Sequence, residues 1–328
     1  MKKIFVKDLK DYLEREIEEI FLVLKINKKQ QRDGSHFLEV TLKDISGSIK
    51  ARLFDNVDLL DKVLEEEKVY RFKAKVYRLN DEVTMKIVDA QRIKDFDIRD
   101  FVPHTDRDIE LMQKDLISIA RNIANPHLRK LLHSFINDEK FMKRFSRAPA
   151  AKMMHHAYIG GLLEHTLSVT RLAETVSKRY SEVDEDLLIT GAILHDVGKI
   201  YEFKFFPEID YTDEGRLLGH IVLGYELVSR KIKEIEDFMG QFPRELSMKL
   251  LHMILSHHGE LEWGSPIRPM TLEAQILHFI DNLDVKVFQF LKAQGERVDE
   301  KARWSLYQRA LGRYVFLGEP PEEDITLE

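Results

Sequence analysis

The sequence predicts an α+β protein with two domains, a small N-terminal β-barrel followed by an all-α helical bundle. Three observations support this prediction. The chain has 328 residues, of which 44% are hydrophobic, and this is enough for roughly two domains that each bury a core. Apolar and polar residues alternate over residues 21–95, which is the period of β-strands. From Asp108 onward, apolar residues recur at helical spacing.

The β domain contains five runs rich in Val, Ile, Phe and Tyr: FLVLKIN, FLEVTL, SIKARLF, VYRFKAKVYRL and VTMKIVDAQRI. An acidic amphipathic opening, DLKDYLEREIEEIF, precedes them. Polar turns around Gly34, Gly47, Asn80 and Asp81 separate the runs. A helical segment, VDLLDKVLEEE, lies between the third and fourth runs. This order of elements is typical of an OB-fold, which we expect over residues 1–98.

The second domain is predicted to be a bundle of helices. The polar segment DFDIRDFVPHTDRD ends the alternation, so we expect a linker and first helix over residues 99–125, the bundle over 126–318 and an acidic tail over 319–328. One short, turn-rich stretch, EFKFFPEIDYTDEGRLL, predicts a small hairpin or flap. The helical segments are IELMQKDLISIARNIA, HLRKLLHSFIND, GGLLEHTLSVTRLAETVSKRY, DEDLLITGAILHDVGKI, GHIVLGYELVSRKIKEI, PRELSMKLLHMILSHH and TLEAQILHFIDNLDVKVFQFL.

Composition limits the possible functions. No apolar run approaches about 20 residues and no basic-then-apolar leader is present, so we expect a soluble, cytoplasmic protein without a membrane partner. The absence of cysteine excludes disulfides and thiolate chemistry, which leaves histidine and carboxylates as metal ligands. The net charge of −6 argues against coating nucleic acid through a general positive field. Any nucleic-acid groove must therefore be a local arrangement of charges.

Histidine and aspartate recur at the edges of apolar helices. His195 and Asp196 end the run GAILHD, directly before Gly198 and Lys199. A single such histidine is commonly a hydrogen-bonded core residue, because an unpaired buried polar group costs a few kcal/mol. Five helices that each offer an inward His or Asp indicate a metal site instead. The further candidates are His165, His220, His257, His258 and Asp281.

Mixed imidazole and carboxylate ligands suit Mn²⁺, Fe²⁺ and other borderline divalent ions. Two such ions roughly 3.5–4 Å apart can activate a water and neutralise charge on a phosphodiester. Three residues past Asp196, Lys199 could stabilise a phosphate in the transition state, with Gly198 permitting the turn that frees it. The alternatives are a solvated lysine and a glycine that merely ends a helix.

The pattern H…HD…D resembles the HD metal-dependent phosphohydrolase superfamily. The resemblance implies that His165, His195, Asp196 and Asp281 hold a first metal. It also implies a second metal bound by His220, His257 and His258, with Asp196 bridging. Whether His257 and His258 both bind, or one only touches substrate, stays open. We expect two ions, with Mn²⁺ favoured and Fe²⁺, Co²⁺ or Mg²⁺ as alternatives.

Three residues near the His165 helix could line the substrate entrance: His155, His156 and Arg147. A helix cap and plain surface charge explain them about as well. In the β domain, two strands alternate buried residues with cations and aromatic rings, a composition suited to single-stranded nucleic acid. An ordinary polar barrel face is the alternative. The outward residues are Lys50, Arg52 and Phe54 on one strand, and Arg71, Lys73, Lys75 and Tyr77 on the other.

The whole chain resembles the YhaM-type 3′→5′ exoribonucleases, through FLEVTLKDISGSIKARLFD, HHAYIGGLLEHTLSV, ILHDVGKIYEF, GRLLGHIVLG and SHHG. The resemblance implies Mn²⁺-dependent release of nucleoside 5′-monophosphates from the 3′ end of single-stranded RNA, with single-stranded DNA as a further substrate. Two alternatives are an HD hydrolase of free nucleotides or cyclic dinucleotides, and a non-catalytic nucleic-acid-binding regulator. An apolar C-terminal helix, ARWSLYQRALGRYVFL, could either form a homo-oligomer interface or cap the bundle.

Overall fold

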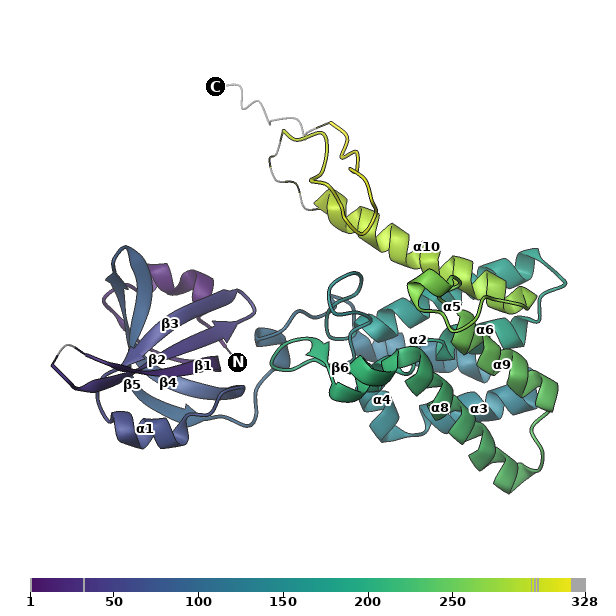
Figure 1. The fold of residues 1–328 in the computed structure, drawn as a ribbon, viewed down its shortest axis with the longest axis horizontal. Helices are drawn as coiled ribbons and strands as arrows, with labels where there is room; N and C mark the ends of the chain where they lie inside the picture. The colour runs from purple at the N-terminus through teal and green to yellow at the C-terminus, as the bar shows by residue number, and fades with distance from the viewer. Residues whose placement is uncertain (1, 32, 296, 298, 300, 320–328) are drawn as a thin grey trace. The chain divides into compact units, whose positions relative to one another are not determined.

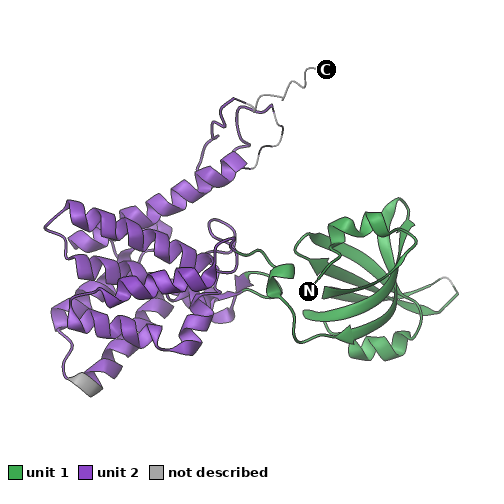
Figure 2. Cartoon of the chain, turned by 180° about the vertical axis from the view of Figure 1, so that it is seen from behind, with its two compact units in different colours: residues 1–104, 205–209 green, residues 105–204, 210–328 purple. Residues whose placement is uncertain are grey.

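The computed structural model describes residues 2–31, 33–295, 297, 299 and 301–319, and its chain divides into two compact units (Figures 1 and 2). The first unit comprises residues 1–104 and 205–209, and the second comprises residues 105–204 and 210–328. No helix of the described residues combines the length and the apolar character needed to cross a membrane.

The first unit is a closed five-stranded barrel. Its strands follow the order β1-β2-β3-β5-β4, with β3 and β5 parallel and every other pair antiparallel. This order, with a helix between β3 and β4, is that of an OB-fold and confirms the predicted fold class. The elements are a 3₁₀ turn (Val6–Tyr12), β1 (Glu16–Gln30), β2 (His36–Asp44), β3 (Gly47–Leu53), α1 (Val57–Val63), β4 (Lys68–Leu79) and β5 (Glu82–Arg92).

Alternation explains the barrel core, since every second side chain of a strand faces inward. Phe21, Leu42, Tyr70 and Phe72 are fully buried in it. The first strand begins earlier than expected, because the acidic stretch EIEEIF belongs to β1. Its glutamates stand opposite lysines of β4, and such cross-strand pairs of opposite charge favour a strand.

The barrel unit continues past residue 98. A short 3₁₀ turn (Ile98–Asp100) is joined to the barrel by a hydrogen bond from the backbone N–H of Ile45 to the carbonyl of Asp100. Phe101 is fully buried against the outer side of β1 and β4, beside Ile20 and Val69. The compact unit therefore ends at His104, six residues beyond the expected boundary at residue 98.

The second unit is all helical apart from one small hairpin, and its long helices follow the predicted segments. Polar caps set several starts, as where the Asp108 carboxylate accepts from the N–H groups of Glu110 and Leu111. The short helix α4 was not predicted. The helices are α2 (Ile109–Arg121), α3 (Pro126–Ile136), α4 (Glu139–Phe145), α5 (Gly161–Arg179), α6 (Glu185–Leu194), α7 (Lys199–Glu202), α8 (Asp213–Met239), α9 (Arg244–Ser256) and α10 (Leu272–Gly295).

Helix α6 occupies the centre of the bundle, where residues 187–194 are all buried. Helices α5, α9 and α10 each pack against it. A helix that is apolar all round must be enclosed on every side. The His-Asp pair follows the last turn of this central helix, so the fold delivers it to the interior.

Two smaller segments complete the description. The predicted flap is a two-stranded hairpin of β6 (Phe203–Lys204) and β7 (Asp210–Tyr211), whose connecting residues 205–209 belong to the barrel unit. The prediction of a C-terminal helix over residues 302–317 is wrong: the described residues there form turns with isolated bridges, Trp304 to Phe316 and Gln308 to Arg313. The expected acidic tail over residues 319–328 lies outside the described residues, apart from residue 319.

Candidate metal centre and barrel surface

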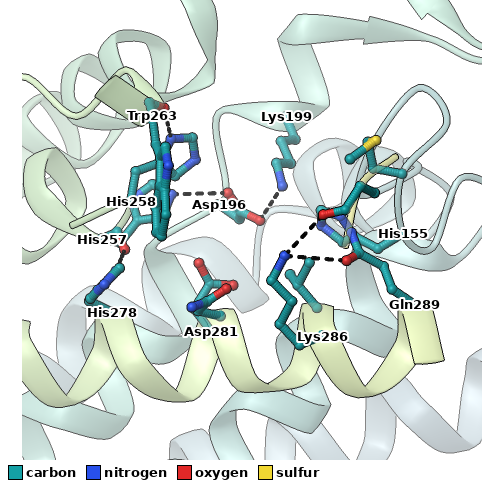
Figure 3. Close-up of a pocket in the computed structure, with 14 residues that line it drawn as sticks. His155, Asp196, Lys199, His257, His258, Trp263, His278, Asp281, Lys286 and Gln289 are labelled. Carbon is teal, nitrogen blue, oxygen red and sulfur yellow. Dashed lines mark hydrogen bonds and ion pairs between the residues drawn. The ribbon is translucent and has the colours of Figure 1, made fainter. Parts of the chain in front are cut away.

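The seven side chains expected to bind metal come together inside the helical unit. Figure 3 shows four of them, Asp196, His257, His258 and Asp281. His165 projects from α5, while His195 and His257 stand at the C-terminal caps of α6 and α9. These three histidines and Asp196 are almost completely buried, with at most 2% of each residue exposed. The remaining members are His220 on α8, His258 beyond α9 and Asp281 on α10.

Four of these residues form a first cluster. The Nε2 atom of His165 lies 3.2 Å from Oδ1 of Asp281, 3.3 Å from Nε2 of His195 and 3.5 Å from Oδ2 of Asp196. Ligands bound to one ion at about 2.0–2.2 Å stand roughly 3.0–3.5 Å apart in octahedral or tetrahedral geometry. The cluster therefore has the dimensions of a single divalent-metal site.

A second cluster uses the other oxygen of Asp196. Its Oδ1 atom lies 3.5 Å from Nε2 of His220 and 3.5 Å from Nε2 of His257. All three atoms are buried, and none has a hydrogen-bond partner in the described structure. His258 offers a further nitrogen to the same group. Unsatisfied buried polar atoms are costly, and a cation between them would satisfy all of them at once.

The Nδ1 atom of each histidine is occupied by a hydrogen bond, which leaves Nε2 for the centre. His195 and His257 use the carbonyls of Ala192 and Ile254, both at 2.8 Å, and His258 uses that of Trp263 at 2.9 Å. Such bonds fix the neutral tautomer with its proton on Nδ1 and its lone pair on Nε2, as metal-binding histidines require. The clusters are thus arranged to receive cations.

Two carboxylates that hold histidines were missed by the sequence analysis. Asp284 lies 2.8 Å from Nδ1 of His165, and Glu202 lies 3.0 Å from Nδ1 of His220. The spacing of Asp284 gives a retrospective signal, because it stands one helical turn after Asp281. Glu202 gives none, since its distance from His220 in the sequence reflects how α7 meets α8.

Charge in the first cluster is balanced for cation binding. Burial opposes a charge on His165, but Asp281 and Asp284 outweigh burial and raise the pKa of this imidazole to about 9. Burial likewise disfavours ionisation of Asp196, yet Lys199 and His195 hold the pKa of its carboxyl well below the usual range. The carboxylates that favour a proton on His165 would equally favour a divalent cation in its place.

Lys199 contacts the carboxylate beside it. Its Nζ atom lies 2.5 Å from Oδ2 of Asp196, and its side chain is 8% exposed. Gly198 does not supply an unusual turn, because its φ of −65° is open to any residue. Its role is close packing, since a Cβ there would stand 2.0 Å from the carbonyl oxygen of His220. This glycine lets α8 bring His220 next to Asp196.

The three residues expected at the substrate entrance lie in different surroundings. His155 lines a cavity of about 320 Å³ beside the clusters, where burial and Lys199 lower its pKa well below the usual range. His156 lies in a buried network, 2.6 Å from the hydroxyl of Tyr158 and 3.4 Å from Asp284. Arg147 is exposed and is not among the described residues that line the cavity.

The candidate nucleic-acid residues of β3 meet a groove on the barrel. Lys50 and Arg52 line it together with Thr41 of β2 and Thr84 of β5. Next to the groove, Phe54 stacks on Phe37, with ring centroids 5.4 Å apart. The guanidinium of Arg52 lies 5.7 Å from the Phe37 ring, and Nζ of Lys86 lies 5.9 Å from Phe54. Neither Phe37 nor Lys86 was expected from the sequence.

The candidate residues of β4 have acidic neighbours. Arg71 and Lys73 lie 3.7 and 3.9 Å from Glu18 of β1, and Lys75 lies 2.8 Å from Glu14. Tyr77, half-buried, stands opposite Thr84 of β5. Cations of the β3 face are paired too, since Arg52 lies 3.9 Å from Glu39 and Lys86 lies 3.1 Å from Asp55. The β3 face differs by the stacked aromatic pair beside it.

Comparison with known proteins identifies the helical unit. Residues 162–286 match the family model described as the HD domain, a stretch that runs from α5 to α10 and contains all seven candidate ligands. The match and the His and Asp clusters indicate a metal-dependent phosphohydrolase.

Two of the solved structures similar to this chain each correspond to about a quarter of it. The mitochondrial single-stranded DNA binding protein Rim1 from S. cerevisiae is 8% identical over 25% of this chain and 96% of its own, with a TM-score of 0.22. The second OB-fold domain of replication protein A from Methanococcus maripaludis is 18% identical over 26% of this chain and 90% of its own, with a TM-score of 0.20.

Proposed function

We propose that the protein is a metal-dependent 3′→5′ exoribonuclease that hydrolyses single-stranded RNA to nucleoside 5′-monophosphates, with single-stranded DNA as a further substrate. It would use two divalent ions, of which Mn²⁺ is favoured. Fe²⁺, Co²⁺ and Mg²⁺ are the alternatives. The resemblance to YhaM-type enzymes suggested this reaction, and the geometry of the helical unit supports it.

The observation that supports it most strongly is the convergence of five Nε2 atoms and two carboxylates on two adjoining buried clusters. When bound, divalent ions supply an activated water and neutralise charge on the attacked phosphodiester. Asp196 contributes one oxygen to each cluster and would hold both ions. The Nδ1 atoms of His257 and His258 are both bonded, which leaves Nε2 of each ring available and supports binding by both.

The role of Lys199 changes in view of its contact with Asp196. Its ammonium contacts the carboxylate that would hold both ions and neutralises its charge. We propose that this lysine also reaches the phosphate of the substrate, where it could stabilise charge in the transition state. Both functions need a cation at this position, so Lys199→Gln would weaken catalysis more than substrate binding.

The barrel would hold the strand that the helical unit cuts. The β3 face offers Lys50 and Arg52 for phosphates and the stacked pair of Phe37 and Phe54 for bases. Stacking on aromatic side chains is worth about 1–3 kcal/mol per base and tolerates every sequence. The four β4 candidates would contribute less, since Glu14 and Glu18 already pair with three of them and the stacked aromatic rings lie beside β3.

Self-association is part of the proposal. Four large apolar side chains of α10 are 48–63% exposed and recur every four residues: Phe279, Leu283, Val287 and Leu291. A stripe of this kind on two copies of the chain could pack as a helical pair. Size-exclusion chromatography with light scattering would measure the mass of the protein in solution. If this stripe is the interface, Leu283→Glu should convert an oligomer to a monomer.

The reaction is tested with a single-stranded RNA labelled at its 5′ end, incubated with Mn²⁺ or with chelator and resolved to single nucleotides. We expect a metal-dependent ladder that shortens from the 3′ end, and no ladder from Asp196→Asn. Early fragments of intermediate length would indicate an internally cutting nuclease. Intact RNA with rapid turnover of free nucleotides or cyclic dinucleotides would favour the small-molecule hydrolase. Binding without any cleavage would establish a regulator.

A further inference from the structure

The cavity beside the metal clusters has walls that metal binding does not explain. Figure 3 shows His258 and Trp263 along one side and His155 along the other, with Lys286 and Gln289 rising from α10. All of these residues belong to the helical unit. At about 320 Å³, the cavity lies near the lower end of the 300–1,000 Å³ that is usual for ligand pockets. It could take one nucleotide but not a longer piece of a strand.

Trp263 is an aromatic side chain held next to a candidate metal ligand. Its carbonyl accepts the hydrogen bond from Nδ1 of His258 at 2.9 Å, so the two residues are fixed together. The 3₁₀ turn Leu261–Trp263 ends at Gly264, whose φ of +85° favours glycine. The residue is 55% exposed, so an aromatic surface beside the cavity is open to a partner.

Lys286 is the cation of the cavity that lacks an anionic partner. Its Nζ atom lies 3.3 Å from the carbonyl of Ala310 and 3.5 Å from Oε1 of Gln289, and both are neutral groups. Among the described residues no carboxylate lies within 4.0 Å of it. Lys199, the other lysine of the cavity, already contacts Asp196. Lys286 is therefore free to bind an anion that enters the cavity.

We propose that this cavity is the binding site for the terminal nucleotide of the strand, in which Trp263 stacks on the base and Lys286 binds the phosphate. The proposal rests on the proposed exonuclease function and adds the residues that select the substrate's last unit. An exposed aromatic face, an uncompensated ammonium and a volume suited to one nucleotide lie together within a few residues of the metal ligands. Stacking would accept any base, and the ammonium would require a phosphate.

The stacking part is tested by tryptophan fluorescence, because the chain contains only two tryptophans. Trp304→Phe leaves Trp263 as the sole fluorophore, and Trp263→Phe leaves Trp304, which does not line the cavity. Adenosine 5′-monophosphate is titrated into each protein with Mn²⁺ present. We expect saturable quenching in Trp304→Phe and none in Trp263→Phe. Trp263→Ala should weaken calorimetrically measured binding about 5- to 150-fold, the range found for one stacked base.

The phosphate part is tested by comparing adenosine 5′-monophosphate with adenosine. Lys286→Met should weaken binding of the nucleotide at least tenfold and leave binding of the nucleoside unchanged. Trp263→Ala should weaken both. Lys178→Met, an exposed lysine at the end of α5, is the matched control and should alter neither.

Failure of this inference differs from failure of the proposed function. If RNA is degraded from its 3′ end but Trp263 shows no quenching, or if Lys286→Met weakens nucleoside and nucleotide equally, the nucleotide site is wrong and the exonuclease stands. If nucleotide binds as described but RNA stays intact, the site is right and the proposed function is wrong.

Discussion

Replacing Asp284 with asparagine tests whether the metal ligands depend on the groups behind them. The carboxylate of Asp284 lies 2.8 Å from Nδ1 of His165 and 3.4 Å from Nε2 of His156, and it accepts a hydrogen bond from Ser168. Asparagine keeps the shape and removes the charge. Loss of such an orienting partner typically weakens metal binding 10- to 100-fold, which corresponds to about 1.4–2.8 kcal/mol.

The burial of Asp284 supports a loss of metal affinity within this 10- to 100-fold range. Its side chain is only 11% exposed, so water screens its interaction with the imidazole poorly. It also helps to raise the pKa of His165, which shows how strongly it favours positive charge at that ring. Isothermal titration of Mn²⁺ into chelator-stripped protein measures the affinity directly, and circular dichroism confirms that each variant is folded.

Glu164→Gln is the matched control for this experiment. This substitution removes the same charge from the same buried network. Glu164 contacts the hydroxyls of Tyr158 and Thr105 and lies 4.0 Å from Arg107, and none of these is a candidate metal ligand. We expect its Mn²⁺ affinity to stay within about threefold of the original. Unchanged affinity in Asp284→Asn, or an equal loss in Glu164→Gln, would refute the assignment of Asp284 as the residue that positions His165.

Three further predictions address the metal, the barrel and the packing of α8. Removing metal with chelator should lower the melting temperature, and Mn²⁺ at 100 times its Kd should restore about 2.7 kcal/mol of unfolding free energy; an unchanged melting curve would contradict metal binding by the folded site. Lys50→Ala with Arg52→Ala should reduce the salt slope of single-strand binding by about 1.4, whereas Lys73→Ala with Lys75→Ala should change it less; the reverse order would place the strand on β4. Gly198→Ala should destabilise the fold by about 1–3 kcal/mol in urea denaturation and weaken the second of two Mn²⁺ binding steps, because α8 must move away; wild-type stability would show that the helix can shift freely.

The candidate metal ligands could be anticipated from the sequence because each is a polar residue inside or at the edge of an apolar helix. His165, His195 and Asp281 break otherwise buried faces, and burial of such groups requires a partner. The all-α character of the second unit followed from the same periodicity. The sequence could not show that these side chains converge, because their convergence depends on how the helices of the bundle pack together.

Residues that act through tertiary contacts could not be anticipated. Glu202 reaches His220 only because Gly198 lets α7 and α8 approach closely. Trp263 sits in a loop without periodicity, so nothing in the sequence relates it to the cavity. The strand order also determines which lysines have an acidic residue opposite them. Lys73 and Lys50 both alternate with buried residues in the sequence, but Glu18 of β1 stands opposite Lys73.

Apolar residues alone misled the prediction at residues 302–317. The apolar residues of ARWSLYQRALGRYVFL suggested a helix, but the segment folds back on itself through the bridge from Trp304 to Phe316. A small cluster around Leu311 and Val315 packs on Ala293 of α10. Short segments of this kind take their conformation from the surface they cover, which local periodicity does not contain.

The central claim is that the two clusters carry out hydrolysis of a phosphodiester at the 3′ end of RNA. The most direct measurement is mass spectrometry of the products formed from single-stranded RNA in ¹⁸O-labelled water with Mn²⁺. The account predicts nucleoside 5′-monophosphates that carry one ¹⁸O atom on phosphorus, formed by the original protein and not by Asp196→Asn. Products with 3′-phosphate or 2′,3′-cyclic phosphate ends, or 5′-monophosphates without the label, would contradict it.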